Sequence, residues 1–133
     1  MGFLIDTSIF VAWERKQLTE DDVRRLAGDE DLALSAITAS ELLHGVHRGD
    51  SAQRRGRRQA FVDAILSTLP VLPIDLAVSR RHAQVWADLR ARGEIIGAHD
   101  LLIAATALVH TLVLATRNQR EFGRVEGLRV AMW

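Results

Sequence analysis

Four short apolar segments constrain the fold most strongly, because a polar residue follows each of them and a helical pattern follows the first three. They are Phe3–Ile5, Leu32–Ser35, Val71–Ile74 and Leu112–Ala115. Their apolar residues run almost continuously instead of alternating with polar ones, as parallel strands buried on both faces require. Strands that alternate with helices predict an α/β fold around a central parallel sheet, and residues 128–130 are predicted to add an edge strand.

Capping residues and apolar spacing predict the helices between these strands. Helices are expected over residues 8–13, over 19–26 with Thr19 as cap, from Thr38 onward, from Asp50 or Ser51 to a stop at Pro70, from Asp75 to Gly93, and over residues 101–109. The fourth is expected to bury Phe61, Ala64, Ile65 and Leu69, and the fifth Val78, His82, Val85 or Trp86, and Leu89. The last is apolar on every side, so it is expected to lie buried between layers.

Composition narrows the class of protein. With 133 residues and 48% apolar content, the chain is predicted to form one domain, residues 1–133, with a sizeable core. It has no cysteine, which excludes disulfides and thiolate sites. No apolar run approaches the ~18 residues of a membrane span, and the N-terminus lacks a signal pattern, so a cytoplasmic protein without membrane contact is expected. Seventeen basic residues balance 17 acidic ones, so net charge points to no partner.

Three carboxylates stand beside these apolar runs, at Asp6, Glu41 and Asp100. All three lie next to expected strand ends or helix N-termini of one sheet, and ligands of parallel sheets bind outside the carboxyl ends of the strands. Carboxylates that converged there would repel one another by about 4 kcal/mol per pair at 4 Å in an effective dielectric near 20. A divalent cation is the simplest way to relieve that repulsion, so their joint placement favours a metal site.

Each carboxylate taken alone also has a purely structural interpretation. Asp6 could cap the helix that follows it. Thr38 and Glu41 have the spacing of a capping box. Asp100 could simply complement the dipole at a helix N-terminus.

Histidine and arginine residues offer weaker candidates. The five histidines show no zinc-ligand spacing. The basic run of Arg48, Arg54, Arg55, Arg57 and Arg58 is interpreted as a solvated helix start in preference to a grip on phosphates. Arg117, beside the proposed site, is the better candidate for contacting a substrate phosphate.

Four ordered motifs resemble the PIN domain family, and most closely its VapC-type ribonuclease toxins. They are Asp6-Thr7-Ser8, the segment from Thr38 to Gly45, the segment from Asp100 to Ala107, and Thr116-Arg117-Asn118 followed by Glu121-Phe122. The resemblance spans nearly the whole chain, with the motifs in the family's order and at its spacing. It implies a three-layer α/β/α sandwich around a mainly parallel sheet.

The resemblance further implies a metal-dependent endoribonuclease that acts as the toxin of a type II toxin–antitoxin pair. Asp6, Glu41 and Asp100 would hold Mg²⁺ or Mn²⁺, and Thr7, Ser8 and Thr116 would position these carboxylates. Asn118 occupies a position where the family often carries a fourth acidic residue, so a second tightly held metal is in doubt. RNA cleavage would leave a 5′-phosphate and a 3′-hydroxyl. The implied partners are a VapB-type antitoxin and a second copy of the chain.

Two other classes of function stay open from the sequence. One is a catalytically weakened module of this fold that binds RNA or protein, with Asn118 as the first sign of decay. The other is a metal-dependent phosphatase or DNA nuclease with a similar cup of acidic residues.

Overall fold

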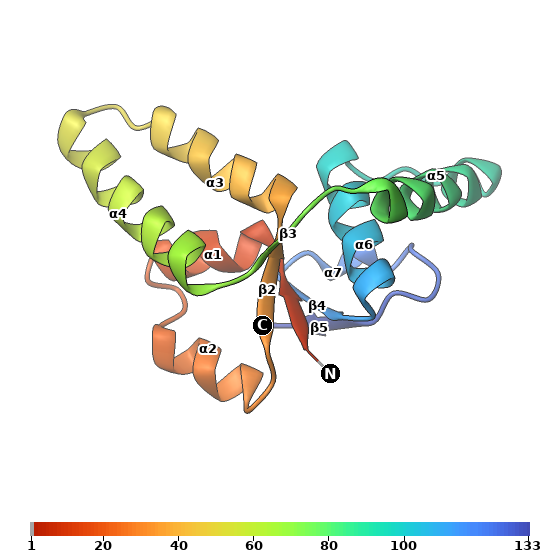
Figure 1. The fold of residues 1–133 in the computed structure, drawn as a ribbon, viewed down its shortest axis with the longest axis horizontal. Helices are drawn as coiled ribbons and strands as arrows, with labels where there is room; N and C mark the ends of the chain where they lie inside the picture. The colour runs from red at the N-terminus through yellow and green to blue at the C-terminus, as the bar shows by residue number, and fades with distance from the viewer. Residues whose placement is uncertain (1) are drawn as a thin grey trace.

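A five-stranded parallel sheet organises residues 2–133, which the computed structural model describes (Figure 1). The strands are β1 (Phe3–Ile5), β2 (Leu32–Ser35), β3 (Val71–Leu72), β4 (Val113–Thr116) and β5 (Val130–Met132). They lie in the order β3-β2-β1-β4-β5, and every neighbouring pair is parallel. The central strand β1 therefore ends between β2 and β4, and the carboxyl ends of all three strands meet at one edge.

Helices cover both faces of this sheet. They are α1 (Thr7–Glu14), α2 (Glu20–Ala27), α3 (Ala36–His47), α4 (Ala52–Thr68), α5 (Leu76–Ala91), α6 (Ala98–His110) and α7 (Gln119–Phe122). Figure 1 shows α1 to α4 on one side of the strands and α5 to α7 on the other. None of the helices described within residues 2–133 is long and apolar enough to cross a lipid bilayer.

Successive strand residues point into two separate cores. Leu4 and Leu114 pack with Val85, Leu89 and the apolar side of α6. Ile5 and Ala115, one position further along the same strands, pack with α1, α3 and α4. Alternate residues of a strand face opposite sides of the sheet, so this division confirms the predicted α/β/α sandwich.

Most predicted elements are confirmed, and the differences have local causes. β3 is shorter than predicted, because Pro73 has no N–H to continue the edge pairing. β5 lies two residues later than predicted. The one-turn helix α7 was not predicted at all; buried Phe122 anchors it.

Two residues that were predicted to face inward, Trp86 and Ala64, are exposed. Trp86 is 51% exposed, whereas Val78, Val85 and Leu89 form the buried face of α5. Ala64 of α4 is exposed, whereas its neighbour Val62 is buried.

The start of α3 also differs from the prediction, and this difference bears on the site. The helix begins at Ala36, and its cap is Ser35, whose hydroxyl accepts the backbone N–H of Ile37 at 3.3 Å. The strand β2 passes directly into the helix without a loop, so the cap falls on the last strand residue. Thr38 consequently lies inside the helix and is fully buried. The capping-box interpretation of Thr38 and Glu41 was wrong.

Candidate functional site

Asp6 lies where β1 ends and α1 begins, at the centre of the carboxyl edge of the sheet. Asp6 occupies the N-cap position of α1, as one interpretation predicted, but its side chain makes no capping hydrogen bond to that helix. Its Oδ2 instead accepts the hydroxyls of Ser8 at 2.6 Å and Thr116 at 2.7 Å. Asp6 is only 4% exposed, and buried carboxylates need such donors to stay charged. Two residues from distant parts of the chain thus fix one carboxylate oxygen.

Glu41 projects from α3 toward the same edge. The Thr7 hydroxyl donates to Glu41 Oε1 at 2.7 Å and lies 3.1 Å from the hydroxyl oxygen of Thr38. The other carboxylate oxygen, Oε2, lies 3.5 Å from Nδ1 of His99. With its capping role excluded, Glu41 is held by side chains of α1 and α6 in an orientation that faces Asp6 and its neighbours.

Asp100 occupies the first turn of α6 and carries a strongly perturbed carboxyl group. The pKa of Asp100 is raised from 3.8 to about 7, chiefly by burial and next by a hydrogen bond with Glu121. The negative charges of Asp6, Glu121 and Glu41 act in the same direction. The hydrogen bond with Asp100 in turn lowers the pKa of Glu121. Because the two pKa values move in opposite directions, a proton held by the pair favours Asp100, which donates the hydrogen bond, and Glu121 accepts it.

Glu121 belongs to the fourth motif, but no functional role was predicted for it. It lies on α7, three residues after Asn118, and its Oε2 is 3.5 Å from the Asn118 side-chain nitrogen. The sequence did contain a signal for this position. Phe122 is an apolar residue shortly after a strand end, and a helical turn that it anchors places the neighbouring Glu121 at the rim of the site. Because α7 was not predicted, that signal was not used.

Asn118 and Arg117 follow β4 at the rim of the site. The backbone N–H of Asn118 donates to the Thr116 hydroxyl at 2.9 Å, and that of Arg117 donates to the Ser8 hydroxyl at 3.1 Å. Both backbone groups thus brace the two hydroxyls that hold Asp6. The Arg117 side chain is exposed at this rim.

The donor chemistry of this site fits a hard divalent cation. The carboxylates of the site offer oxygen atoms as ligands, and oxygen is the ligand type that Mg²⁺ and Mn²⁺ prefer. The raised pKa of Asp100 comes first from burial, and the negative charges of Asp6, Glu121 and Glu41 add to it a repulsion that a cation would relieve. Within residues 2–133, however, no three acidic or histidine side chains are already grouped closely enough to hold an ion. Metal binding would therefore draw these side chains together from their present positions.

From the raised pKa of Asp100 we predict how the stability of the metal-free protein depends on pH. A carboxyl whose pKa is higher in the folded state than in the unfolded chain contributes stability that is complete below about pH 4 and is lost as pH rises through 7. The difference between the two pKa values corresponds to about 4 kcal/mol if unscreened. Solvent screening at this half-buried carboxyl reduces that to about 1–2 kcal/mol.

The Asp100→Asn variant should not lose stability as pH rises, because the amide stays neutral and can still donate a hydrogen bond to Glu121. In EDTA at pH 8 we therefore expect the variant to be more stable than the parent by about 1–2 kcal/mol, and at pH 4 we expect the two to match. Urea denaturation at both pH values measures the difference. A variant that gained nothing between pH 4 and pH 8 would contradict the raised pKa.

Fold and site together define a class: an α/β/α protein with a cluster of carboxylates at the carboxyl edge of a parallel sheet. The family model of the PIN domain matches residues 3–128. The chain belongs to the PIN domain family.

Its curated relatives are VapC ribonucleases. Ribonuclease VapC1 of Rickettsia felis is 35% identical over 130 residues, which cover 98% of this chain and 95% of the relative. The tRNA(fMet)-specific endonuclease VapC of Shigella flexneri is 30% identical over 133 residues, covering 100% and 98%. The resemblance of the four motifs to the VapC type is confirmed.

Solved structures show the same fold at full length. The VapBC2 complex of Rickettsia felis bound to a promoter DNA fragment contains a chain with a TM-score of 0.90 and 28% identity, covering 100% of this chain and 99% of that one. The DNA-bound VapBC complex of Salmonella typhimurium gives 0.89 and 28%, with 100% and 98% covered.

Proposed function

We propose that this protein is a metal-dependent endoribonuclease that acts as the toxin of a type II toxin–antitoxin pair. The observation that carries the proposal is the gathering of Asp6, Glu41, Asp100 and Glu121 at one edge of the sheet, with their charges coupled, in a chain related to VapC ribonucleases along its length. Scattered carboxylates with only capping or dipole roles would not perturb one another in this way.

In this proposal Asp6, Glu41 and Asp100 hold Mg²⁺ or Mn²⁺, and Asn118 assists at the rim. Such an ion, when bound, lowers the pKa of a coordinated water and neutralises charge on the scissile phosphate. The chain's own residues set the geometry. Ser8 and Thr116 fix one oxygen of Asp6, Thr7 fixes one oxygen of Glu41, and His99 lies 3.5 Å from the other oxygen of Glu41.

The remaining groups act on the proton and the substrate. The Asp100–Glu121 pair lies at the site with a pKa near neutrality, which suits a group that takes up or releases a proton there. Arg117 is proposed to contact a substrate phosphate. In-line attack by water oxygen on phosphorus breaks the bond to the 3′ oxygen, which takes up a proton, and leaves a 5′-phosphate and a 3′-hydroxyl.

The assembly is part of the same proposal. Structures similar to this chain are toxins in complex with VapB-type antitoxins, so we propose a VapB-type antitoxin as the protein partner. We further propose that residues 1–133 act as one nuclease domain, paired as a homodimer and located in the cytoplasm.

The experiment that tests the function is cleavage of a labelled RNA pool by the purified protein with Mn²⁺. We expect cleavage in Mn²⁺, none in EDTA, and none by Asp6→Ala, because the carboxylate at the centre of the site is then missing. DNA and a small phosphoester, incubated in parallel, distinguish a ribonuclease from a DNA nuclease or a phosphatase. Thermal unfolding of Asp6→Ala shows whether the variant stays folded.

The opposite result has a definite meaning. If protein shown by mass spectrometry to be free of antitoxin leaves RNA intact in Mn²⁺ and in Mg²⁺, the proposed activity is wrong. A binding module of the same fold would then be the better description.

A further inference from the structure

A surface groove runs from the carboxylates along the outer side of α1 and α3. It has a volume of about 450 Å³, and Thr7 and Glu41 of the site line one end of it. Arg15 and Arg48 belong to the same lining. These arginines are the C-cap residues of α1 and α3. The groove thus joins the acidic site to two arginines at the far ends of the helices that build it.

Helix geometry sets the length of this groove. Arg48 lies seven residues beyond Glu41 on α3, and Arg15 lies eight residues beyond Thr7 on α1. At 1.5 Å per residue these separations are about 10 and 12 Å along the helix axes. A stacked nucleic-acid strand rises about 3.4 Å per nucleotide, so the distance corresponds to about three nucleotides.

The groove is negative at the site end and positive at the arginine end, and positive charge suits the phosphates of an RNA strand. Glu14, the last residue of α1 and the neighbour of Arg15, is paired with Arg58 at 3.0 Å, and Arg58 also donates to the backbone oxygen of Gly45. That pair contributes no net charge. Among residues 2–133, neither the Arg15 nor the Arg48 side chain has an acidic or hydrogen-bonding partner, so both guanidinium groups are available for phosphates.

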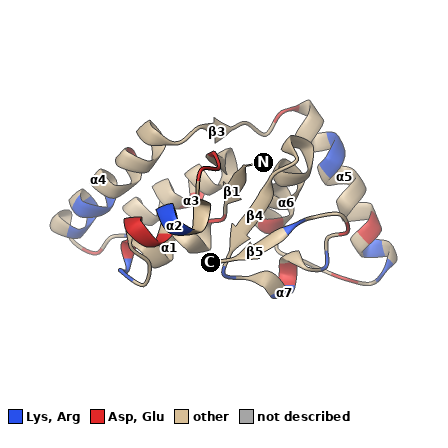
Figure 2. Ribbon diagram, turned by 90° about the horizontal axis from the view of Figure 1, so that it is seen from below, with Lys and Arg blue, Asp and Glu red and all other residues tan. Residues whose placement is uncertain are grey.

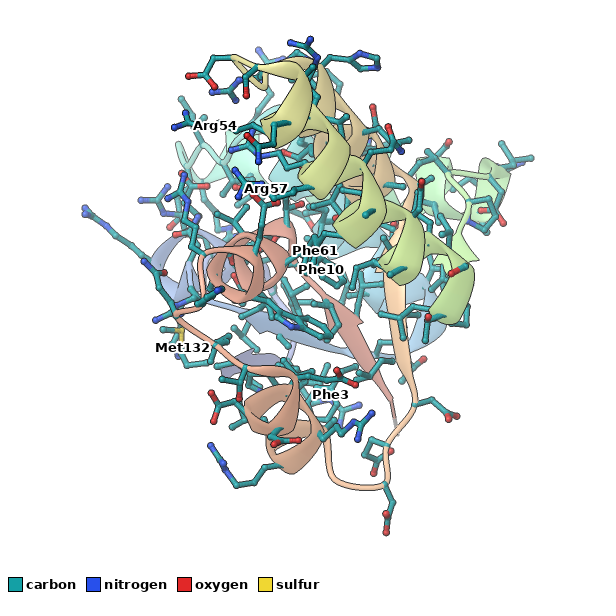
Figure 3. All side chains as sticks on the ribbon, turned by 90° about the vertical axis from the view of Figure 1, so that its left-hand side faces the viewer. Phe3, Phe10, Arg54, Arg57, Phe61 and Met132 are labelled. Carbon is teal, nitrogen blue, oxygen red and sulfur yellow. The ribbon has the colours of Figure 1, made fainter. Side chains whose placement is uncertain are left out.

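The rest of the basic run does not extend this groove to the site. Arg54 pairs with Asp50, and Arg55 donates to the backbone oxygen of Gly49. Figure 2 shows the basic segments of α4, and Figure 3 shows Arg54 and Arg57 on that helix beside α1. Arg54 and Arg57 line a separate hollow, which the Glu14–Arg58 pair divides from the groove and which reaches none of the site carboxylates.

We propose that the groove between the site and the two C-cap arginines carries the RNA strand on one side of the cleaved bond, with Arg15 and Arg48 as contacts to its phosphates. This inference rests on the proposed ribonuclease function and adds to it a direction and a length for the bound strand. Among residues 2–133, His44 and His99 are the aromatic side chains that line the groove and no Phe, Tyr or Trp does, so the two arginines make the phosphate backbone the main feature recognised there.

The test compares Arg15→Gln, Arg48→Gln and the double variant with Arg80→Gln, an exposed arginine of α5 across the sheet. Two RNA substrates carry the same cleaved bond: a 12-nucleotide strand, and a fragment with one nucleotide on each side of the bond. We expect each groove variant to lower kcat/KM for the long strand about tenfold, mainly through KM. The double variant should also lower the slope of log(kcat/KM) against log[salt] by about 1.4, since each phosphate contact contributes about 0.7.

The short fragment distinguishes the groove proposal from the proposed ribonuclease function. Its kcat/KM should not change in any groove variant, because it does not reach the arginines. If the double variant cleaves the long strand like Arg80→Gln, with the same salt slope, the groove proposal is overturned and the ribonuclease function stands. If the parent cleaves neither RNA in Mn²⁺, the ribonuclease function fails, and the groove proposal with it.

Discussion

Replacing Asp100 by Asn should lower RNA cleavage by on the order of 10³-fold while the protein remains folded and still binds RNA. The change keeps the size of the side chain and its hydrogen bond to Glu121, but removes the charge that the proposed metal site and proton-transfer pair require. Single-turnover cleavage of the RNA pool in Mn²⁺ measures the rate, and fluorescence anisotropy measures RNA binding.

Asp88→Asn is the matched control, because Asp88 is an exposed aspartate of α5, a helix on the opposite side of the sheet from α1 and α3. It should cleave RNA like the parent. Cleavage by Asp100→Asn at the parental rate would show that Asp100 takes no part in the chemistry. Loss of both cleavage and RNA binding would instead assign Asp100 to substrate binding.

Saturating Mn²⁺ should raise the thermal unfolding midpoint of the parent protein at pH 8 by about 10 °C. A ligand at a hundred times its dissociation constant stabilises the folded state by about 2.7 kcal/mol, and a chain of this size gains a few degrees for each kcal/mol. At pH 8 the charged carboxylates repel one another most strongly, so the cation has the most repulsion to relieve. Differential scanning calorimetry with and without EDTA measures the shift.

Calorimetry on variants shows whether the rise in the unfolding midpoint comes from an ion bound at the carboxylate site. Asp88→Asn should gain as much as the parent, whereas Asp6→Ala and Asp100→Asn should gain little. An equal gain in all four proteins would place the ion elsewhere, and no gain in the parent would remove the metal from the proposal. Because calorimetry needs no RNA, this result is independent of whether the correct RNA target has been found.

The central strands were predictable because their signal is local. Phe3–Ile5 and Leu32–Ser35 form strands over the residues predicted, since continuous apolar runs of this length suit a sheet that is covered on both faces. The helices α2 and α5 were predicted from their caps, and Thr19 and Asp75 do accept the backbone N–H groups of Asp22 and Val78. Such hydrogen bonds join residues three apart, so sequence spacing reveals them.

The errors arose where a distant contact decided the outcome. Thr38 has the spacing of a cap, but β2 runs without a loop into α3, and Ser35 takes that role. Trp86 and Val85 were equally apolar candidates for the inner face of α5, and the packing of α5 against α6 selected Val85. One turn of helix at residues 119–122 was too short to give a periodic signal.

The alternation of strands and helices, the family, and the three carboxylates beside apolar runs could all be read from the residues alone. These depend on residue type and short spacing, which act within a few positions of the chain. The folded chain was needed to show that hydroxyls from residues 8 and 116 bind the same oxygen of Asp6, that Glu121 raises the pKa of Asp100, and that a groove connects Glu41 to Arg15 and Arg48. Those relations join residues up to 110 positions apart, and they exist only once the parallel sheet has brought its strand ends to one edge.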